Sequence, residues 1–284
     1  MKAFVFLFIF SLAYGSYAHA LEVQVPKVVD QGAPFWAEIK VKKNVQSIRI
    51  TWLKKSFVLP ARHKEQQVLL AAGLKCSGKK LLLVEAGDRG RVKKWVLIRK
   101  KEFPAQYLRL PEKMVTPPKK VLDRIYAEKK LITMTLEKIS PVRYFQSSFV
   151  WPVKSKILSV FGLRRFLNNK PRSPHRGIDL RAPLNTPIRA FNAGQVALIG
   201  EFYFGGKTVI IDHGLGVYSI YMHLNKIKVK KGQVVSRAEI IGLAGKTGRA
   251  TGPHLHFALS VLGQLADPVP LLKGNSNRAI APKF

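Results

Sequence analysis

Five of the seven histidines lie within residues 175–256, a stretch that contains few acidic side chains. His175 and Asp179 are four residues apart. Pro174 and Gly177 argue against a helix here, because proline lacks an amide proton and glycine disfavours helical backbone. We therefore expect an extended or bent segment to bring this imidazole and this carboxylate together.

Three more histidines could join this pair. His254 and His256 are two residues apart in a strand-like run, so their side chains point to the same face of a sheet. His223 ends another strand-like segment. A lone histidine is more often structural than a ligand, but the set supplies two neutral nitrogens and a carboxylate, with two imidazoles to spare. Three protein ligands and an open fourth position are the pattern of catalytic zinc, and no thiolate competes.

These residue types meet the needs of peptide-bond hydrolysis. Zinc lowers the pKa of its bound water to about 7 and polarises a carbonyl group. A neutral histidine nearby can take the proton from that water, and a second can stabilise the tetrahedral oxyanion. The pattern therefore predicts a hydrolase with one zinc ion per chain.

A longer series of motifs surrounds the histidines and runs over residues 149–268. Its members are Phe161-Gly162-Leu163-Arg164, the His-x3-Asp at His175 to Asp179, Ala182-Pro183, Thr186-Pro187, Asp212-His213-Gly214, Tyr221-Met222-His223-Leu224, Gly245-Lys246-Thr247-Gly248, Thr251-Gly252-Pro253-His254-Leu255-His256-Phe257 and Asp267-Pro268. In order and spacing this series resembles the lysostaphin/LytM family of zinc metallopeptidases, which are peptidoglycan endopeptidases.

The resemblance implies roles for individual residues. It implies that zinc is held by His175, Asp179 and His256. It makes His223 and His254 the catalytic pair, with His254 as the general base, and it leaves His213 structural. The implied fold is a compact antiparallel β-sheet with the active site in a groove across it.

The resemblance also implies a substrate, the peptide cross-links of bacterial peptidoglycan. We expect the D-alanyl–meso-diaminopimelate bond first and the glycyl-glycine bridge second. The alternative is an exported LytM-like wall-binding protein that regulates other hydrolases without cleaving. Because all five site residues are present, loss of ligands does not support that alternative.

The chain divides into regions of different composition, and the fold class expected is mainly β. Residues 21–103 read as short strands separated by turns, which predicts an Ig-like β-sandwich like the accessory region of Gram-negative exported family members. Trp36 and Trp52 are expected in its core. Residues 104–148 form a proline-rich linker that includes a helix from Lys119 to about Glu137. Residues 149–284 are the expected zinc peptidase domain, with many short strands and tight turns.

Charge and the N-terminus indicate where the protein acts. The 49 Lys and Arg outnumber the 16 Asp and Glu, giving a net charge of +33 that favours polyanionic partners. Residues 1–20 have the form of a cleaved signal peptide ending in Ala18-His19-Ala20; a retained membrane anchor is the alternative. We therefore expect a periplasmic or extracellular protein whose basic surface attracts anionic wall polymers or is simply solvated. Export argues against nucleic acid as the partner. Cys76 is the only cysteine, which excludes an intramolecular disulfide.

Overall fold

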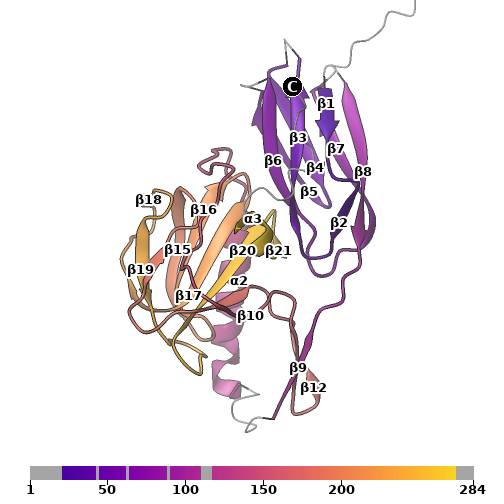
Figure 1. The fold of residues 1–284 in the computed structure, drawn as a ribbon. Coiled ribbons are helices and arrows are strands. Elements are labelled where there is room, and N and C mark those ends of the chain that lie inside the picture. Colours follow the sequence, from indigo (N-terminus) through magenta and orange to yellow (C-terminus); the bar gives the residue numbers. More distant parts are fainter. Residues whose placement is uncertain (1–20, 43–44, 62–63, 88–89, 110–116, 273–284) are drawn as a thin grey trace, which may run out of the picture.

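The computed structural model describes residues 21–272 apart from 43–44, 62–63, 88–89 and 110–116. The signal-peptide prediction for residues 1–20 lies outside the described residues. Strands make up most of the two bodies in Figure 1, and one long helix accompanies them, so the mainly β expectation is confirmed. Among the described residues, no helix is both long and apolar enough to span a membrane.

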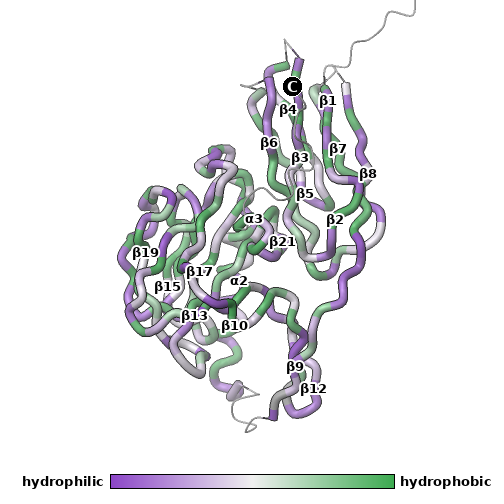
Figure 2. The backbone as a smooth tube through the Cα atoms, in the orientation of Figure 1, coloured by the Kyte–Doolittle hydropathy of each residue, from purple (hydrophilic) through white to green (hydrophobic). Residues whose placement is uncertain are grey.

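Two antiparallel-rich sheets form the N-terminal body. The smaller sheet contains, in spatial order, β1 (Leu21–Gln24), β3 (Pro34–Val41) and β6 (Glu65–Ala71). The larger contains β2 (Val28–Asp30), β8 (Arg91–Arg99), β7 (Gly78–Glu85), β4 (Ser47–Trp52) and β5 (Lys55–Pro60). Along β4 every second residue is buried, as expected for strands with one face on a core, and Figure 2 shows the matching alternation of hydropathy.

The two sheets share a core in which Trp52 is the largest fully buried side chain. Its indole nitrogen donates to the carbonyl of Ala71 at 2.8 Å, which ties β4 to β6 across the sheets. Trp36 is only partly buried and packs instead toward the C-terminal body, against Phe145 and Phe149, with ring centroids 6.2 and 6.5 Å away. Trp52 is thus the core residue expected, whereas Trp36 lies at a boundary.

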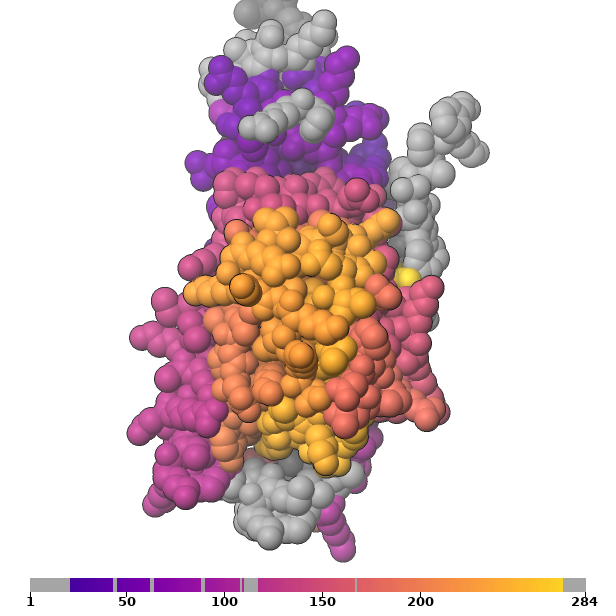
Figure 3. All heavy atoms as spheres, turned by 90° about the vertical axis from the view of Figure 1, so that its left-hand side faces the viewer, coloured from indigo at the N-terminus to yellow at the C-terminus, as the bar shows by residue number. Residues whose placement is uncertain are grey.

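The segment between the two bodies contains more structure than a linker. The expected helix is present as a 3₁₀ turn, η2 (Lys119–Val121), followed by α2 (Leu122–Glu137). It lies along the flank of the C-terminal body, as Figure 3 shows, and Arg124 donates to the carbonyl of Glu201 there. Upstream, β9 (Ala105–Leu108) pairs in parallel with β11 (Arg164–Leu167), which also pairs with β12 (Lys170–Pro171). This small sheet was not predicted.

The C-terminal body is built on one antiparallel sheet, as expected. Its main path contains β10 (Ile157–Ser159), β13 (Ile178–Arg181), β20 (His254–Val261), β17 (Val217–Ile227), β16 (Gly206–Gly214), β15 (Gly194–Phe202) and β18 (Val234–Val235). Beside this path lie β14 (Pro187–Arg189), β19 (Ile240–Ala244) and β21 (Gln264–Ala266), and the short helix α3 (Val269–Leu272) follows. The neighbours β13, β20 and β17 carry the candidate site.

Candidate metal centre

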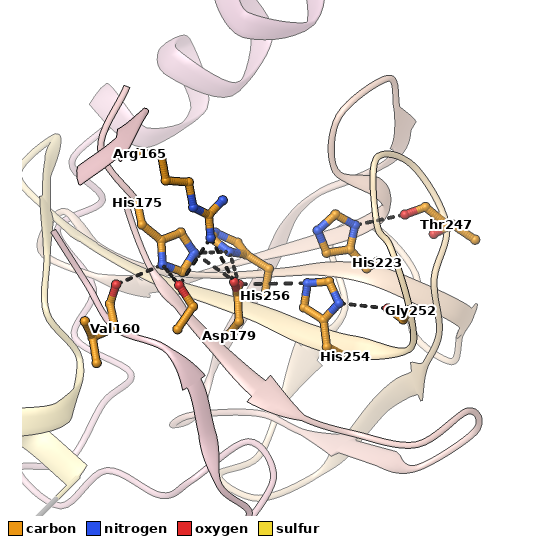
Figure 4. Close-up of polar contacts among 10 residues, drawn as sticks. Val160, Arg165, His175, Asp179, His223, Thr247, Gly252, His254 and His256 are labelled. Carbon is orange, nitrogen blue, oxygen red and sulfur yellow. Dashed lines mark hydrogen bonds and ion pairs between the residues drawn. The ribbon is translucent and has the colours of Figure 1, made fainter. Parts of the chain in front are cut away.

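Three donor atoms converge between β10, β13 and β20 (Figure 4). The β13–β20 register sets Asp179 opposite His256, and His175 lies in the segment that leads into β13. Asp179 Oδ1 is 3.0 Å from His175 Nε2 and 2.8 Å from His256 Nδ1, and the two imidazole nitrogens are 3.0 Å apart. The chain thus brings together the three residues expected as ligands.

Hydrogen bonds fix how these side chains face one another. His175 Nδ1 lies 2.9 Å from the carbonyl oxygen of Val160, which can only accept, so Nδ1 carries the proton and the lone pair of Nε2 faces Asp179. Arg165 contacts the other carboxylate oxygen, Asp179 Oδ2, at 3.4 Å. Burial lowers the pKa of His256, which keeps this ring neutral. Without a metal ion, burial raises the pKa of the Asp179 carboxyl, but hydrogen bonds from the His175 and His256 rings, when these are protonated, outweigh burial and hold this pKa well below its ordinary value.

The donor set fits a divalent metal ion. Two imidazole nitrogens and a carboxylate oxygen are all electron-pair donors when none of them carries a proton, and at about 3 Å they then repel one another unless a cation lies between them. The imidazole and carboxylate groups suit zinc. Among the described residues, these three form the only group of histidine, cysteine or acidic side chains close enough to hold a metal ion.

His223 and His254 form a second pair beside the three donors. Their ring centroids are 4.7 Å apart, and His254 Nε2 is 3.9 Å from Asp179 Oδ1. In each ring Nδ1 lies 2.9 Å from a backbone carbonyl, that of Thr247 for His223 and that of Gly252 for His254. Figure 4 shows both rings beside these carbonyls. Carbonyl oxygens accept, so in each neutral ring Nδ1 carries the proton and Nε2 does not.

His223 is held under constraint. Its φ is +63°, in the left-handed region that non-glycine residues seldom occupy, and its amide donates to the carbonyl of Gly205 at 2.8 Å. Burial lowers the pKa of His223 to about 4, so the ring is neutral at pH 7. A neutral imidazole in a fixed orientation can accept a proton or orient a water molecule.

His213 lies apart from this group, in the interior of the sheet. It is fully buried, with Nδ1 2.7 Å from the carbonyl of Ala193 and Nε2 2.7 Å from Ser219 Oγ. Both ring nitrogens are therefore occupied by the protein itself.

Sequence reasoning missed two residues of the site. Arg165 contacts Asp179, but nothing in its spacing distinguishes it from the many other basic residues. Gly177 entered the sequence argument only as a helix breaker. A Cβ built on it would lie 2.5 Å from the Phe257 carbonyl oxygen and 2.9 Å from ring atoms of His256, so this position has room for glycine alone.

The metal centre lies inside the part of the chain that matches a known family. Residues 173–268 match the profile of peptidase family M23. This region of the chain belongs to family M23. The match contains all five site residues, and the resemblance to lysostaphin/LytM-type peptidases is confirmed.

Two curated proteins are similar in sequence to part of this chain. Peptidoglycan DD-endopeptidase ShyA of Vibrio cholerae is 44% identical over 128 residues, which are 44% of this chain and 29% of ShyA. DD-carboxypeptidase/endopeptidase Mpg of Neisseria meningitidis is 39% identical over 117 residues, 41% of this chain and 27% of Mpg. The chain thus spans less than a third of the length of these relatives.

The arrangement of most of this chain also has a counterpart among solved structures. A crystal structure of an M23 peptidase candidate from Pseudomonas aeruginosa is 29% identical and superposes with a TM-score of 0.66. The superposition covers 85% of this chain and 94% of that one. The likeness therefore extends beyond the M23 region to the N-terminal sheets.

Proposed function

We propose that this chain is an exported zinc endopeptidase that hydrolyses peptide cross-links of bacterial peptidoglycan. The observation that carries the proposal is the convergence of His175 Nε2, Asp179 Oδ1 and His256 Nδ1 beside two histidines with bare nitrogens. The name of the relative ShyA supplies the substrate class, peptidoglycan. The names of ShyA and of the relative Mpg both specify DD bonds, so the D-alanyl–meso-diaminopimelate bond is the first candidate and the glycyl-glycine bridge the second.

Each site residue then has a chemical role. His175, Asp179 and His256 hold zinc, which when bound polarises the scissile carbonyl and acidifies water. His254 is the general base: its Nε2 takes a proton from the attacking water while the Gly252 carbonyl holds its Nδ1–H and stabilises the imidazolium that forms.

The role of His223 follows from its tautomer. Because the Thr247 carbonyl fixes the proton on Nδ1, the Nε2 of His223 accepts hydrogen bonds and does not donate them. In this form His223 orients the attacking water. It stabilises an oxyanion only after it takes up a proton, which burial disfavours.

In this proposal, the rest of the chain directs the peptidase domain to the cell wall. Residues 1–20 are a signal peptide, 21–103 an Ig-like accessory domain, 104–148 a linker and 149–284 the peptidase domain. Peptidoglycan lies outside the cytoplasm, so the substrate requires export. The net charge of +33 attracts the carboxylates and phosphates of wall polymers. A non-cleaving wall-binding regulator is disfavoured, because the donor set is intact.

Digestion of purified cross-linked sacculi, with mass spectrometry of the released muropeptides, tests the proposal. Wild type, chelator-treated wild type, His256→Ala and His254→Ala are compared, and zinc content is measured for each. We expect His256→Ala to lose zinc, and His254→Ala to keep zinc and lose turnover by about 10²- to 10⁴-fold. Cleavage by both variants at the wild-type rate would refute the role assignments.

A further inference from the structure

Three arginines from two separate segments interact with one another, and one of them, Arg165, contacts Asp179 of the metal centre. Arg165 lies on β11, and the amide of Arg172 donates to the Arg165 carbonyl at 2.8 Å, which joins them across the β11–β12 hairpin. Arg249 lies between β19 and β20, in the loop whose Thr247 and Gly252 carbonyls hold the two catalytic histidines. Its guanidinium covers the Phe204 ring at 4.3 Å, and its amide donates to the Phe204 carbonyl at 3.0 Å.

The arginines are close enough for their charges to interact. Burial lowers the pKa of Arg249, and repulsion from Arg165 and then Arg172 lowers it further. In the described part of the chain, neither Arg172 nor Arg249 makes an ion pair with an acidic side chain, and Arg165 pairs only with Asp179. Like charges gathered without acidic partners create a positive potential that attracts an anion.

Arg165 also has an unused donor. Its Nη2 is 3.2 Å from Ser159 Oγ and 3.4 Å from Asp179 Oδ2, so this nitrogen is occupied. Its Nε is buried and has no hydrogen-bond partner among the described residues. Two serine hydroxyls share that condition, but Arg165 Nε is the only one of the three that belongs to a charged group. A buried charged donor without an acceptor is unfavourable, and a bound carboxylate would satisfy it.

We propose that Arg165, Arg172 and Arg249 form a carboxylate-binding subsite for the amino acid whose amine leaves during hydrolysis. This inference rests on the proposed endopeptidase function and narrows its substrate. Arg165 contacts Asp179, so an anion bound to it lies next to the metal centre. In a D-alanyl–meso-diaminopimelate cross-link, the carbon attached to the scissile nitrogen also carries a free carboxylate. Because the subsite lies next to the metal centre, it binds only a carboxylate that is this close to the scissile bond.

The reaction balances with no further reactant. Water adds to the D-alanyl carbonyl carbon, the carbon–nitrogen bond breaks, and the nitrogen departs as an amine with a proton that the water gave up. The D-alanyl group becomes a carboxylic acid, and the leaving amino acid keeps its α-carboxylate against the arginines. A terminal D-alanyl-D-alanine bond has the same grouping, whereas a bond within a glycyl-glycine bridge lacks it. The subsite therefore predicts trimming of terminal D-alanine as well.

Paired substrates test the subsite. Two stem pentapeptides that end in D-alanyl-D-alanine, one as the free acid and one as the primary amide, differ only in this carboxylate. We expect wild type to prefer the acid by about tenfold to a hundredfold in kcat/KM. Arg249→Ala should lower kcat/KM for the acid by a similar factor relative to the amide, so that the preference for the acid is lost. Lys230→Ala removes one exposed charge beside β18, at the far end of the sheet, and should change neither value.

A binding measurement separates this inference from the function on which it rests. Calorimetry with zinc-loaded His254→Ala should detect D-alanine, the leaving product, more strongly than D-alaninamide, and the added Arg249→Ala change should remove the difference. Equal kcat/KM for acid and amide, or full discrimination by Arg249→Ala, would overturn the subsite. Wild type that cleaves neither peptide would overturn the predicted trimming of terminal D-alanine; sacculi digestion decides on the proposed function separately, and the calorimetric comparison would still decide on the subsite.

Discussion

His213 should make the stability of this protein sensitive to acid at a site remote from the metal centre. Burial lowers the pKa of His213 to about 4, against 6.5 for an unperturbed ring. Below about pH 6.5 the unfolded chain therefore binds a proton on His213, whereas the folded chain does not bind this proton until the pH approaches 4. The contribution of neutral His213 to the free energy of unfolding is fully present above pH 6.5 and is lost as the pH falls toward 4. For these two pKa values, the loss between pH 7.5 and pH 5.0 is about 2 kcal/mol.

Urea unfolding of the metal-free protein at these two pH values measures the effect. His213→Gln should be less stable than wild type at pH 7.5, because the buried ring and its bond to Ala193 are lost, but acidification should cost it about 2 kcal/mol less. Ser219→Ala is the matched control, since it removes the partner of Nε2 and keeps the titrating ring. His223 and His256 also titrate, but they are common to all three proteins. If His213→Gln and wild type lose equal stability on acidification, the reasoning is wrong.

Two further substitutions test the packing of the site and of the N-terminal sheets. Gly177→Ala should weaken zinc binding by about 10- to 100-fold, measured by competition with a chromogenic chelator, because the added methyl group displaces the His256 ring. Unchanged zinc affinity would show that the ring has room to adapt. Trp52→Phe should lower the free energy of unfolding by about 1–3 kcal/mol in urea titrations, since it leaves the Ala71 carbonyl without its donor and opens space in the core.

Local sequence patterns predicted many of the strands, because apolar and polar residues alternate along a strand that has one face in the core. In β20, Leu255 and Phe257 are fully buried, and His254 and His256 alternate with them on the other face. The sequence could therefore assign both histidines to one surface. The strand period alone could not say which of them lies beside the carboxylate, and His256 was named only through the family resemblance. The register decides this, since Asp179 is opposite His256 and Arg181 is opposite His254.

Contacts between short segments that lie far apart in the chain could not be predicted from the sequence. The strand β9 has only four residues, and its parallel partner β11 follows about 60 positions later. No local sequence pattern therefore predicts that these two strands pair. The same pairing fixes the backbone on which Arg165 stands. With 49 basic residues in the chain, only the fold distinguishes an arginine at the site from one on a solvated surface. The Ig-like assignment and the domain boundaries remain predictions.

Gly32 connects the N-terminal sheets to the metal centre through one aromatic ring. Its φ is +86°, and a Cβ built on it would lie 2.7 Å from Cε1 of Phe161. Phe161 is followed by Gly162, whose amide donates to the His175 carbonyl at 2.8 Å, and the His175 amide donates to Leu163 at 2.9 Å. A displacement of the Phe161 ring therefore reaches the backbone of a proposed zinc ligand within two hydrogen bonds.

Substitution of this glycine should weaken metal binding from outside the M23 region. Gly32→Ala combines backbone strain with displacement of Phe161, and Gly78→Ala separates the two effects, because Gly78 has φ +76° and open space around it. Both variants should lose about 1–2 kcal/mol of stability through left-handed strain. Only Gly32→Ala should bind zinc more weakly, by about tenfold in chelator competition. Equal zinc affinity in the two variants would mean that the contact between Gly32 and Phe161 does not hold the His175 segment in position.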